Sequence, residues 1–284
     1  MAQSSPFDLS GRVALVTGGG ANGGIGHAIA MGMAAAGADI LAADRDAAGA
    51  ERTAQEARDM GRRAIAVTCD FSQTGQIESA YRALDEHFGR IDILVNNVGT
   101  NIREQPESAT PANVEAAIRL NMLGTFTSTQ QAGRRMIAAG RGGSIISIAS
   151  IAGVLALGRA NTVYSMTKAA ILQMTRELAV EWGRYHIRVN AILPAQTLVP
   201  GMKLYVANPD MNGPRFAAET VRGIPLNRLA EPEDMAGPAV FLASDAAAFV
   251  SGVHLPVDGG NLAMNAGATL RYHLDEQGRT IWED

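Results

Sequence analysis

The residues best suited to chemistry are a tyrosine and a lysine in the segment Tyr164-Ser165-Met166-Thr167-Lys168. This segment begins a stretch of helical spacing that runs to Trp182, so Tyr164 and Lys168 are predicted to lie one turn apart on one helical face. A phenol has a pKa of about 10 and is a poor base at neutral pH, but nearby positive charge stabilises the phenolate. We therefore predict that Tyr164 is a general acid and base assisted by Lys168.

A serine upstream completes a candidate catalytic set. Ser150 follows the apolar run at residues 145–148, so it is expected just past the carboxyl end of a strand, where open α/β sheets bind their ligands. Its hydroxyl is suited to binding a substrate oxygen. Each residue alone has an ordinary structural explanation, as a helix-surface contact or a turn, and the combination is what favours catalysis.

A glycine-rich loop separates the first apolar run from a helical stretch. Glycines in this position let the backbone turn tightly and approach a pyrophosphate, whose charge is favoured by the N–H groups and dipole of the helix start. The placement between strand and helix favours a dinucleotide site over a merely flexible turn. The candidate contacts in this loop are Gly18, Asn22, Gly24, Ile25 and Gly26.

The second apolar run ends in an acidic residue. Asp44 is suited to accept hydrogen bonds from the adenosine ribose hydroxyls, and its charge repels a 2′-phosphate. This predicts NAD as the cofactor. The adjacent Arg45 is able to receive a phosphate, so NADP stays the less favoured alternative.

Short apolar runs alternate with stretches of helical spacing along most of the chain. Runs that are apolar on both faces are typical of a parallel sheet covered on both sides. We predict one α/β domain over residues 9–264, a doubly wound (Rossmann) parallel sheet of about seven strands flanked by helices on both faces. The runs are residues 13–16, 40–43, 65–67, 91–95, 145–148 and 187–189, and the helical stretches include 24–36, 47–60, 76–88 and 111–139.

Two segments fall outside this alternation. Residues 195–226 carry four prolines (Pro200, Pro209, Pro214 and Pro225) after the sixth predicted strand, where a lid is expected. Residues 265–284 are interpreted as a C-terminal extension and possible hairpin.

Composition excludes several classes of protein. The chain has 284 residues, 47% hydrophobic and 18% charged, so a packed globule is expected. A formal charge of −4 gives no general attraction to nucleic acid or to an anionic membrane, and no secretion signal or long apolar span is evident, so we expect a cytoplasmic protein. The single cysteine, Cys69, is assigned to core packing, and the five histidines lack metal-ligand spacing, so no metal site is predicted.

Taken together, the motifs make the chain resemble the short-chain dehydrogenase/reductase family, in its shorter single-domain branch, over roughly residues 9–262. The resemblance implies that Tyr164 is the acid and base, that Lys168 holds the nicotinamide ribose and lowers the pKa of Tyr164, that Ser150 orients the substrate oxygen and that Asn121 positions a relay water. The motifs are the loop from Thr17 to Gly26, Asp44, Cys69-Asp70-Phe71, Asn96-Asn97-Val98-Gly99, Asn121, Ser150, the Tyr164 and Lys168 pair, Pro194 and Val257-Asp258-Gly259-Gly260.

The resemblance also implies further cofactor contacts and an assembly. Asp70 is expected against the adenine with a backbone group of Phe71, and Asn97 at the adenosine ribose. A homotetramer or homodimer is expected, paired through the helices that contain Asn121 and Tyr164. The other expected cofactor contacts are Val98, Gly99, Tyr164, Lys168, Pro194 and Thr197.

The chain departs from the family pattern at several places, among them Val98, where an alanine is usual. The glycine loop is two residues longer than usual. Ser150 lies one residue farther from Tyr164 than is common, which leaves Ser147 as an alternative. Val199 stands where a threonine usually bonds the nicotinamide carboxamide, so Thr197 or backbone groups are expected to take that role.

The substrate is the least determined feature. The residues expected to contact it are Ser150, Leu155, Tyr164, Met202 and Tyr205. The expected lining is mostly apolar, so we predict an uncharged cyclic or aromatic secondary alcohol that the enzyme interconverts with its ketone. These apolar lining residues, mainly in the lid segment, are Leu155, Leu157, Val199, Met202, Leu204, Tyr205 and Met211. A sugar or polyol dehydrogenase is the alternative, because the polar side chains Asn101, Arg103, Arg159 and Lys203 are able to recognise a sugar or carboxylate. A dinucleotide-sensing regulator is the non-enzyme alternative, and it has no chemical need for the catalytic set.

Overall fold

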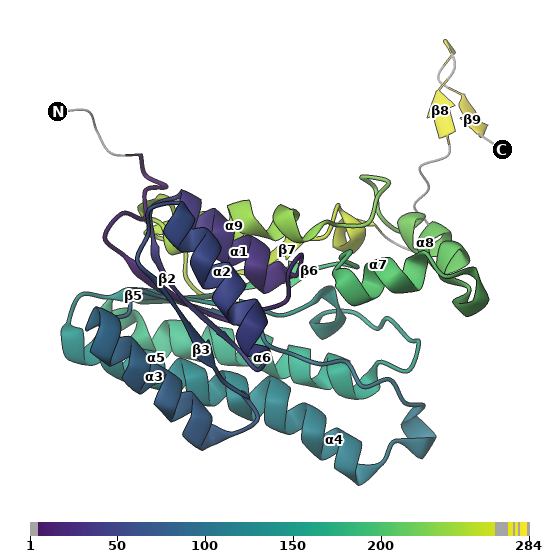
Figure 1. Cartoon of the computed structure of the whole chain (residues 1–284). Helices are drawn as coiled ribbons and strands as arrows, with labels where there is room; N and C mark the ends of the chain where they lie inside the picture. The colour runs from purple at the N-terminus through teal and green to yellow at the C-terminus, as the bar shows by residue number, and fades with distance from the viewer. Residues whose placement is uncertain (1–4, 265–271, 275, 278, 283–284) are drawn as a thin grey trace.

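Seven strands form one parallel sheet in the order β3-β2-β1-β4-β5-β6-β7 (Figure 1). The structure is a computed structural model that describes residues 5–264, 272–274, 276–277 and 279–282. Strands β1 to β3 are added toward one edge of the sheet and strands β4 to β7 toward the other. The boundary between β1 and β4 is therefore the switch point at which such sheets bind ligands. The strands are β1 (Val13–Thr17), β2 (Asp39–Asp44), β3 (Ala64–Thr68), β4 (Ile93–Asn96), β5 (Gly143–Ile148), β6 (Ile187–Pro194) and β7 (His254–Val257).

Helices cover both faces of the sheet, as Figure 1 shows. Alternate residues of each strand point to opposite faces, so Val16 packs with α1, α2 and α9, whereas Leu15 packs with α3 and α5. The prediction of a doubly wound sheet of about seven strands is confirmed. The helices on the first face are α1 (Ile25–Ala35), α2 (Ala47–Asp59) and α9 (Ala236–Ala243), and those on the second are α3 (Thr74–Phe88), α5 (Thr125–Ala139) and α6 (Thr162–Trp182).

The helical stretch predicted over residues 111–139 is not one regular α-helix. It begins as α4 (Pro111–Ile118), widens into the π-helical turn η2 (Arg119–Gly124) and continues as α5. A π-turn inserts an extra residue into the helix and is often found at functional sites.

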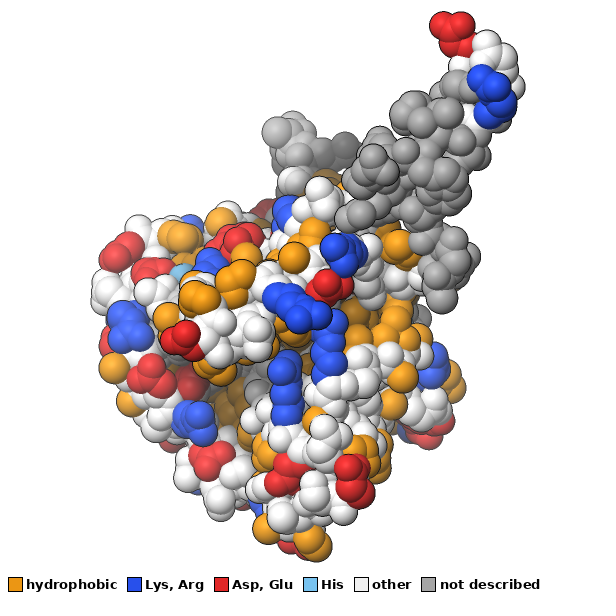
Figure 2. Space-filling model, turned by 90° about the vertical axis from the view of Figure 1, so that its right-hand side faces the viewer, with side chains coloured by type: hydrophobic (Ala, Val, Ile, Leu, Met, Phe, Trp, Pro, Cys, Tyr) orange, Lys and Arg blue, Asp and Glu red, His pale blue; other side chains and the backbone are white. Residues whose placement is uncertain are grey.

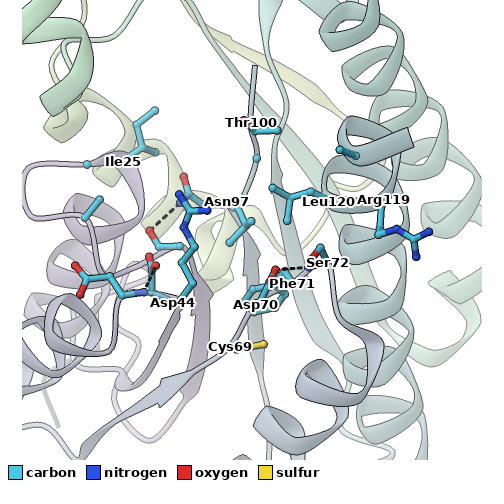
Figure 3. Close-up of a pocket in the computed structure, with 18 of the residues that line it drawn as sticks. Ile25, Asp44, Cys69, Asp70, Phe71, Ser72, Asn97, Thr100, Arg119 and Leu120 are labelled. Atoms are coloured by element: carbon cyan, nitrogen blue, oxygen red, sulfur yellow. Dashed lines mark hydrogen bonds between the residues drawn. The ribbon is translucent and has the colours of Figure 1, made fainter. Parts of the chain in front are cut away.

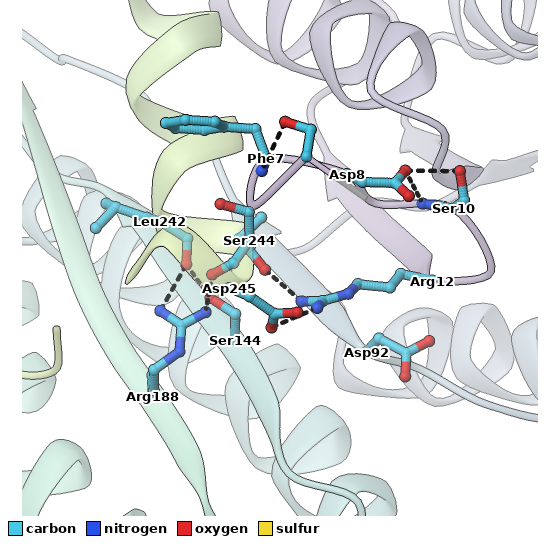
Figure 4. A network of polar contacts seen from close by, with 12 residues as sticks. Phe7, Asp8, Ser10, Arg12, Asp92, Ser144, Arg188, Leu242, Ser244 and Asp245 are labelled. Carbon is cyan, nitrogen blue, oxygen red and sulfur yellow. Dashed lines mark hydrogen bonds and ion pairs between the residues drawn. The ribbon is translucent and has the colours of Figure 1, made fainter. Parts of the chain in front are cut away.

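A polar network anchors the end of the sheet opposite the candidate site (Figure 4). Arg188 of β6 donates to Leu242 O at 2.7 Å and to Ser244 O at 3.2 Å, and Arg12 donates to Ala243 O at 2.9 Å. These carbonyls lie at or just past the C-terminus of α9, where a helix leaves its acceptors unpaired and favours cations. The two guanidinium groups therefore fix α9 to the sheet.

The segment at residues 195–226 contains α7 (Pro200–Val206), the short turn η5 (Pro209–Met211) and α8 (Gly213–Val221). Its base is tied by a bridge between Thr197 and Ala230, with hydrogen bonds from Leu198 N to Ala230 O at 2.7 Å and from Ala230 N to Gln196 O at 3.0 Å. Beyond the main domain, β8 (Tyr272–Leu274) pairs antiparallel with β9 (Thr280–Trp282). Among the residues described, no helix has the length and apolar character needed to cross a membrane.

Candidate active site

A cleft of about 940 Å³ opens at the carboxyl ends of β1 to β4 (Figure 3). Figure 2 views the end of the molecule where α7 and α8 lie, and Lys and Arg side chains gather near the middle of that face. The opposite wall of the cleft comes from α4 and η2, including Arg119 and Leu120, which the sequence did not indicate. Ten predicted cofactor residues line the cleft: Gly18, Gly24, Ile25, Asp44, Arg45, Asp70, Phe71, Asn97, Val98 and Gly99.

The glycine loop packs too tightly for side chains at two positions. Gly18 has a φ of +68°, which favours glycine. A Cβ on Gly26 would lie 2.3 Å from Gly18 O and 2.6 Å from Asn97 Nδ2. Gly26 is therefore what lets α1 begin directly behind the loop, with its N-terminus facing the cleft, and this arrangement fits a dinucleotide pyrophosphate.

Replacing Gly26 by alanine is expected to weaken dinucleotide binding by about tenfold or more, because the loop must move away from the new methyl group. Gly75→Ala is the matched control, since a Cβ on Gly75 of α3 would meet no atom within 4 Å. Quenching of intrinsic fluorescence by NADH measures the affinity, and a thermal melt separates loss of binding from loss of folding. Equal dissociation constants for the two variants would contradict this role of the loop.

The carboxylate of Asp44 is held at the rim of the cleft. Its Oδ2 accepts from Gly20 N at 2.9 Å and its Oδ1 accepts from Asp46 N at 2.9 Å. Arg45 is exposed and lines the same cleft. Asp44, whose carboxylate favours an unphosphorylated ribose, and Arg45, whose guanidinium favours a ribose phosphate, therefore both line the cleft.

Asn97 stabilises the glycine loop. Its Nδ2 donates to Thr17 O and to Gly18 O, both at 3.1 Å, while Thr17 Oγ1 accepts from the backbone N–H groups of Asn97 and Val98 at 2.9 and 3.1 Å. These bonds join the ends of β1 and β4. The Asn97 side-chain nitrogen is bonded to loop carbonyls, so Asn97 shapes the cleft in addition to lining it.

Ser150 and Tyr164 meet at the carboxyl end of β5. Ser150 is the N-cap of the short turn η3 (Ile151–Gly153), and its Oγ accepts from Ala152 N at 3.1 Å. Burial raises the pKa of Tyr164, and a side-chain hydrogen bond with Ser150 acts in the opposite direction. Ser147, the alternative, is fully buried within β5, and its hydroxyl has no partner among the described residues. The geometry therefore favours Ser150.

Lys168 is buried beneath the same site. Only 3% of its surface is exposed, its Nζ donates to Ile148 O at 2.7 Å, and Nζ lies 5.6 Å from the centroid of the Tyr164 ring. Burial lowers the pKa of Lys168 to about 8. Burial thus favours the neutral form of both groups, and the expected lowering of the phenol's pKa by the Lys168 charge is not seen in this structure.

Asn121 lies in the π-turn and is fully buried. Its Oδ1 accepts from Thr100 N at 2.8 Å, and its Nδ2 donates to Thr100 O at 2.9 Å and to Thr167 Oγ1 at 3.0 Å. Thr100 also lines the cleft. The two threonines, which the sequence did not single out, thus connect Asn121 to the cleft and to α6.

Gly99 joins the two parts of the site. A Cβ on this residue would lie 3.4 Å from Lys168 Nζ and 3.5 Å from Asn121 Oδ1, and Gly99 itself lines the cleft. The candidate catalytic residues are therefore at the inner end of the candidate cofactor cleft. In this position a proton-accepting group would act on the oxygen, and a bound dinucleotide on the carbon, of one substrate C–OH group.

Other predicted contacts do not line the cleft. Thr197 Oγ1 donates to Ala195 O at 3.0 Å, so its hydroxyl is used within the backbone, while residues 199–201 line the cleft instead. The residues predicted to contact ligand but absent from the lining are Asn22, Gly26, Ser150, Leu155, Tyr164, Lys168, Pro194, Thr197, Met202 and Tyr205. Cys69 does line it, although it is 1% exposed, and burial raises the pKa of its thiol to about 12. In the described part of the chain no three His, Cys, Asp or Glu residues form a metal-binding group.

Comparison with known proteins identifies the relatives of this chain. The family described as enoyl-(acyl carrier protein) reductase matches residues 19–261. The chain is 41% identical over 257 residues to a D-threitol dehydrogenase from Mycolicibacterium smegmatis, covering 89% of this chain and 94% of that one. It is 36% identical over 258 residues to a 2-dehydro-3-deoxy-D-gluconate 5-dehydrogenase from Dickeya dadantii, covering 90% and 98%.

A crystal structure agrees with these matches. A gluconate 5-dehydrogenase from Burkholderia cenocepacia in complex with NADP and tartrate superposes with a TM-score of 0.84 at 34% identity, covering 92% of this chain and 98% of that one. The family match covers strands β2 to β7, the glycine loop from Gly19 onward and the helix that carries Tyr164 and Lys168. The chain is an oxidoreductase that acts on alcohol groups, and it belongs to the short-chain dehydrogenase/reductase family.

Proposed function

We propose that the protein is a sugar or polyol dehydrogenase that interconverts a secondary alcohol and a ketone with a nicotinamide dinucleotide. The observation that carries this proposal is the joining of two half-sites at Gly99. On one side lies a dinucleotide-sized cleft, and on the other lie Ser150, Tyr164, Lys168 and Asn121. A protein that only sensed the dinucleotide would have no use for the second half-site.

In the proposed mechanism each catalytic side chain either binds the substrate oxygen or takes part in proton transfer. Ser150 Oγ accepts from Ala152 N, and its O–H, which hydrogen-bonds with Tyr164 in this structure, is proposed to donate to the substrate oxygen when substrate is bound. Tyr164 removes the alcohol proton as the ketone forms. A bound nicotinamide supplies the hydride acceptor. Lys168 Nζ, anchored on Ile148 O, passes the proton onward to a water molecule that Asn121, anchored on Thr100, would position.

The substrate class follows the alternative reading of the sequence rather than the first one. The similar proteins named above act, by their names, on threitol, a deoxygluconate and gluconate. A cyclic or aromatic alcohol was expected from the apolar residues of the lid, but Tyr205 packs edge-on against Phe216 with ring centroids 5.2 Å apart. Such side chains fill space within the lid, so their apolar character is weak evidence about the substrate.

The cofactor proposal keeps NAD as the preferred dinucleotide. Two backbone N–H groups hold the Asp44 carboxylate at the rim, where a ribose 2′-phosphate would be repelled. The relative from B. cenocepacia was solved with NADP, and Arg45 beside Asp44 provides a cation for the same phosphate. Use of both cofactors with a preference for NAD is therefore the proposed behaviour.

Oxidation of a panel of alcohols tests the proposal. We expect D-threitol or a related open-chain polyol to give a kcat/KM at least about tenfold above that of cyclohexanol, and NAD to exceed NADP by a similar factor. Absorbance of the reduced nicotinamide measures both. Turnover confined to cyclic or aromatic alcohols would overturn the substrate proposal, and a higher kcat/KM with NADP would overturn the cofactor preference.

We also propose that the protein assembles as a homodimer or homotetramer through the helices that carry Asn121 and Tyr164. Leu123 and Phe126 support this proposal, because both lie beside Asn121 along the chain and both are nearly half exposed. Light scattering on the purified protein measures the assembly, and a monomer at micromolar concentration would contradict it.

A further inference from the structure

We propose that Arg159 is a positioning residue that latches the lid segment, residues 195–226, to the start of α6 and thereby sets the affinity for an open-chain polyol. The inference rests on the proposed function for its substrate. Its contacts, however, belong to the protein alone and are testable without turnover.

Arg159 contacts α8 in two ways. Its guanidinium carbon lies 4.8 Å from the centroid of the Phe216 ring, and its Nη1 donates to Thr220 Oγ1 at 3.3 Å. Phe216 and Thr220 are four residues apart on α8, so they share the helix face that Arg159 covers. Because Phe216 also packs against Tyr205 of α7, Arg159 contacts α8 directly and is linked to α7 through the Phe216 ring.

The backbone around Arg159 adopts an unusual conformation. Gly158, Arg159 and Ala160 have φ values of +63°, +58° and +59°, so three consecutive residues are left-handed and two of them carry a Cβ. Such a conformation is unfavourable for L-residues and persists only where surrounding contacts hold it. The turn places Arg159 against α8, and we infer that the contacts with α8 help to offset its strain.

The same turn ends at the catalytic helix. Asn161, which is 5% exposed, donates from Nδ2 to Gly158 O at 2.8 Å and accepts at Oδ1 from Asn101 Nδ2 at 2.7 Å. It immediately precedes α6, and Tyr164 lies in the first turn of that helix. Asn101 in turn follows Thr100, the partner of Asn121. The contacts therefore run from the lid through Arg159 to the start of α6, which carries Tyr164, and to the segment that holds Asn121.

The lid is attached at its base and also at its end, where Asn261 Nδ2 donates to Gly223 O at 2.6 Å and Leu226 N donates to Gly259 O at 3.1 Å. The bridge between Thr197 and Ala230 closes the base, and Arg159 holds α8 at the far part of the segment. Each hydrogen bond between the protein and a small hydroxylated substrate replaces hydrogen bonds to water. A closed lid excludes that water, so it contributes more to binding such a substrate than apolar contact does. We therefore expect loss of the latch to act on KM for the polyol more than on kcat.

The kinetic test compares Arg159→Ala with Arg222→Ala. Arg222 is also exposed, but it pairs with Glu219 on its own helix at 3.0 Å and so does not link α8 to α6. Arg159→Ala is expected to raise KM for the polyol about tenfold with kcat within about threefold, while Arg222→Ala keeps both values. Arg159→Lys should resemble Arg159→Ala, because an ammonium lacks the planar group that stacks on Phe216.

Two further variants separate the latch from general instability. Phe216→Leu should raise KM for the polyol. Combining it with Arg159→Ala should raise KM little further, because both changes remove the same contact between Arg159 and the Phe216 ring. Thr220→Val is a milder change that removes only the hydroxyl partner of Arg159. Fully additive effects of Arg159→Ala and Phe216→Leu, or an unchanged KM in Arg159→Ala, would overturn the proposal.

Limited trypsin digestion provides a readout that needs no substrate. Lys203 and Arg215 lie inside the lid, and we expect cleavage after them to be about fivefold faster in Arg159→Ala than in wild type or Arg222→Ala, with similar melting temperatures. If wild type oxidises no polyol and cleavage still accelerates, the proposed function fails and the latch stands. If cleavage and KM both match Arg222→Ala, the latch fails and the proposed function stands.

Discussion

Replacing Tyr164 by phenylalanine is expected to lower kcat for alcohol oxidation by about a thousandfold or more, while the dissociation constant for NADH stays within about twofold. The substitution removes one oxygen, the proposed proton acceptor, and leaves the ring that packs near Lys168 Nζ. Steady-state kinetics with a polyol and NADH fluorescence titration give the two quantities. The result would place Tyr164 in the chemistry and not in cofactor binding.

Tyr185→Phe is the matched control for this change. Tyr185 lies in the short turn η4 (Gly183–Tyr185) after α6, and its ring contacts Arg184. Loss of its hydroxyl is expected to leave kcat unchanged. A Tyr164→Phe enzyme with more than about a tenth of wild-type kcat would show that another group accepts the proton.

Replacing Lys168 by methionine is expected to lower kcat by about a hundredfold, because the buried ammonium supports the phenolate and the proton relay. The same change alters the pH dependence of stability. Burial lowers the pKa of Lys168 from 10.5 to about 8, so the folded protein releases this proton before the unfolded chain does. Between those pH values the unfolded state binds more protons at this site, so the contribution of Lys168 to the free energy of unfolding should rise with pH by up to about 1.4 kcal/mol per unit.

Urea denaturation across that pH range measures the effect. Below about pH 8 both states carry the charge and the contribution of Lys168 is constant. Lys203→Met is the control, because the side chain of Lys203 is 54% exposed and pairs with Glu231 at the surface. The slope of the free energy of unfolding against pH should be less positive in Lys168→Met than in Lys203→Met. Identical slopes in the two variants would contradict the burial of the Lys168 charge.

The order of strands and helices was largely predictable, because runs that are apolar on both faces occur where parallel strands are covered twice. The exception is instructive. The strand β7 reads His254-Leu255-Pro256-Val257 and is only partly buried at the edge of the sheet, so it shows no continuous apolar run. The π-turn at Arg119–Gly124 was also missed, since Asn121 is held by Thr100 and Thr167, which are distant in sequence.

The candidate site was predictable where chemistry dictates residue type and spacing. Gly18 and Gly26 must be glycines for the loop to pack, and Tyr164 and Lys168 must be one turn apart to act together. The wall from α4 and η2 and the lid residues at 199–201 carry no such signature, because ordinary side chains line the cleft there. The comparisons favour the alternative substrate class, a sugar or polyol, and the first prediction was poorly founded because apolar composition does not distinguish packing within a lid from contact with a ligand.

The most direct test of the central claim is ultraviolet difference titration of tyrosinate in the complex with NAD. Burial raises the pKa of Tyr164 in the protein alone, so bound nicotinamide and protonated Lys168 must reverse this shift if the phenol is to act as a base. We predict one tyrosine that ionises at least about one unit below the ordinary pKa near 10 when NAD is bound, and its disappearance in Tyr164→Phe. An early tyrosinate that persists in Tyr164→Phe, or none in wild type, would contradict the account.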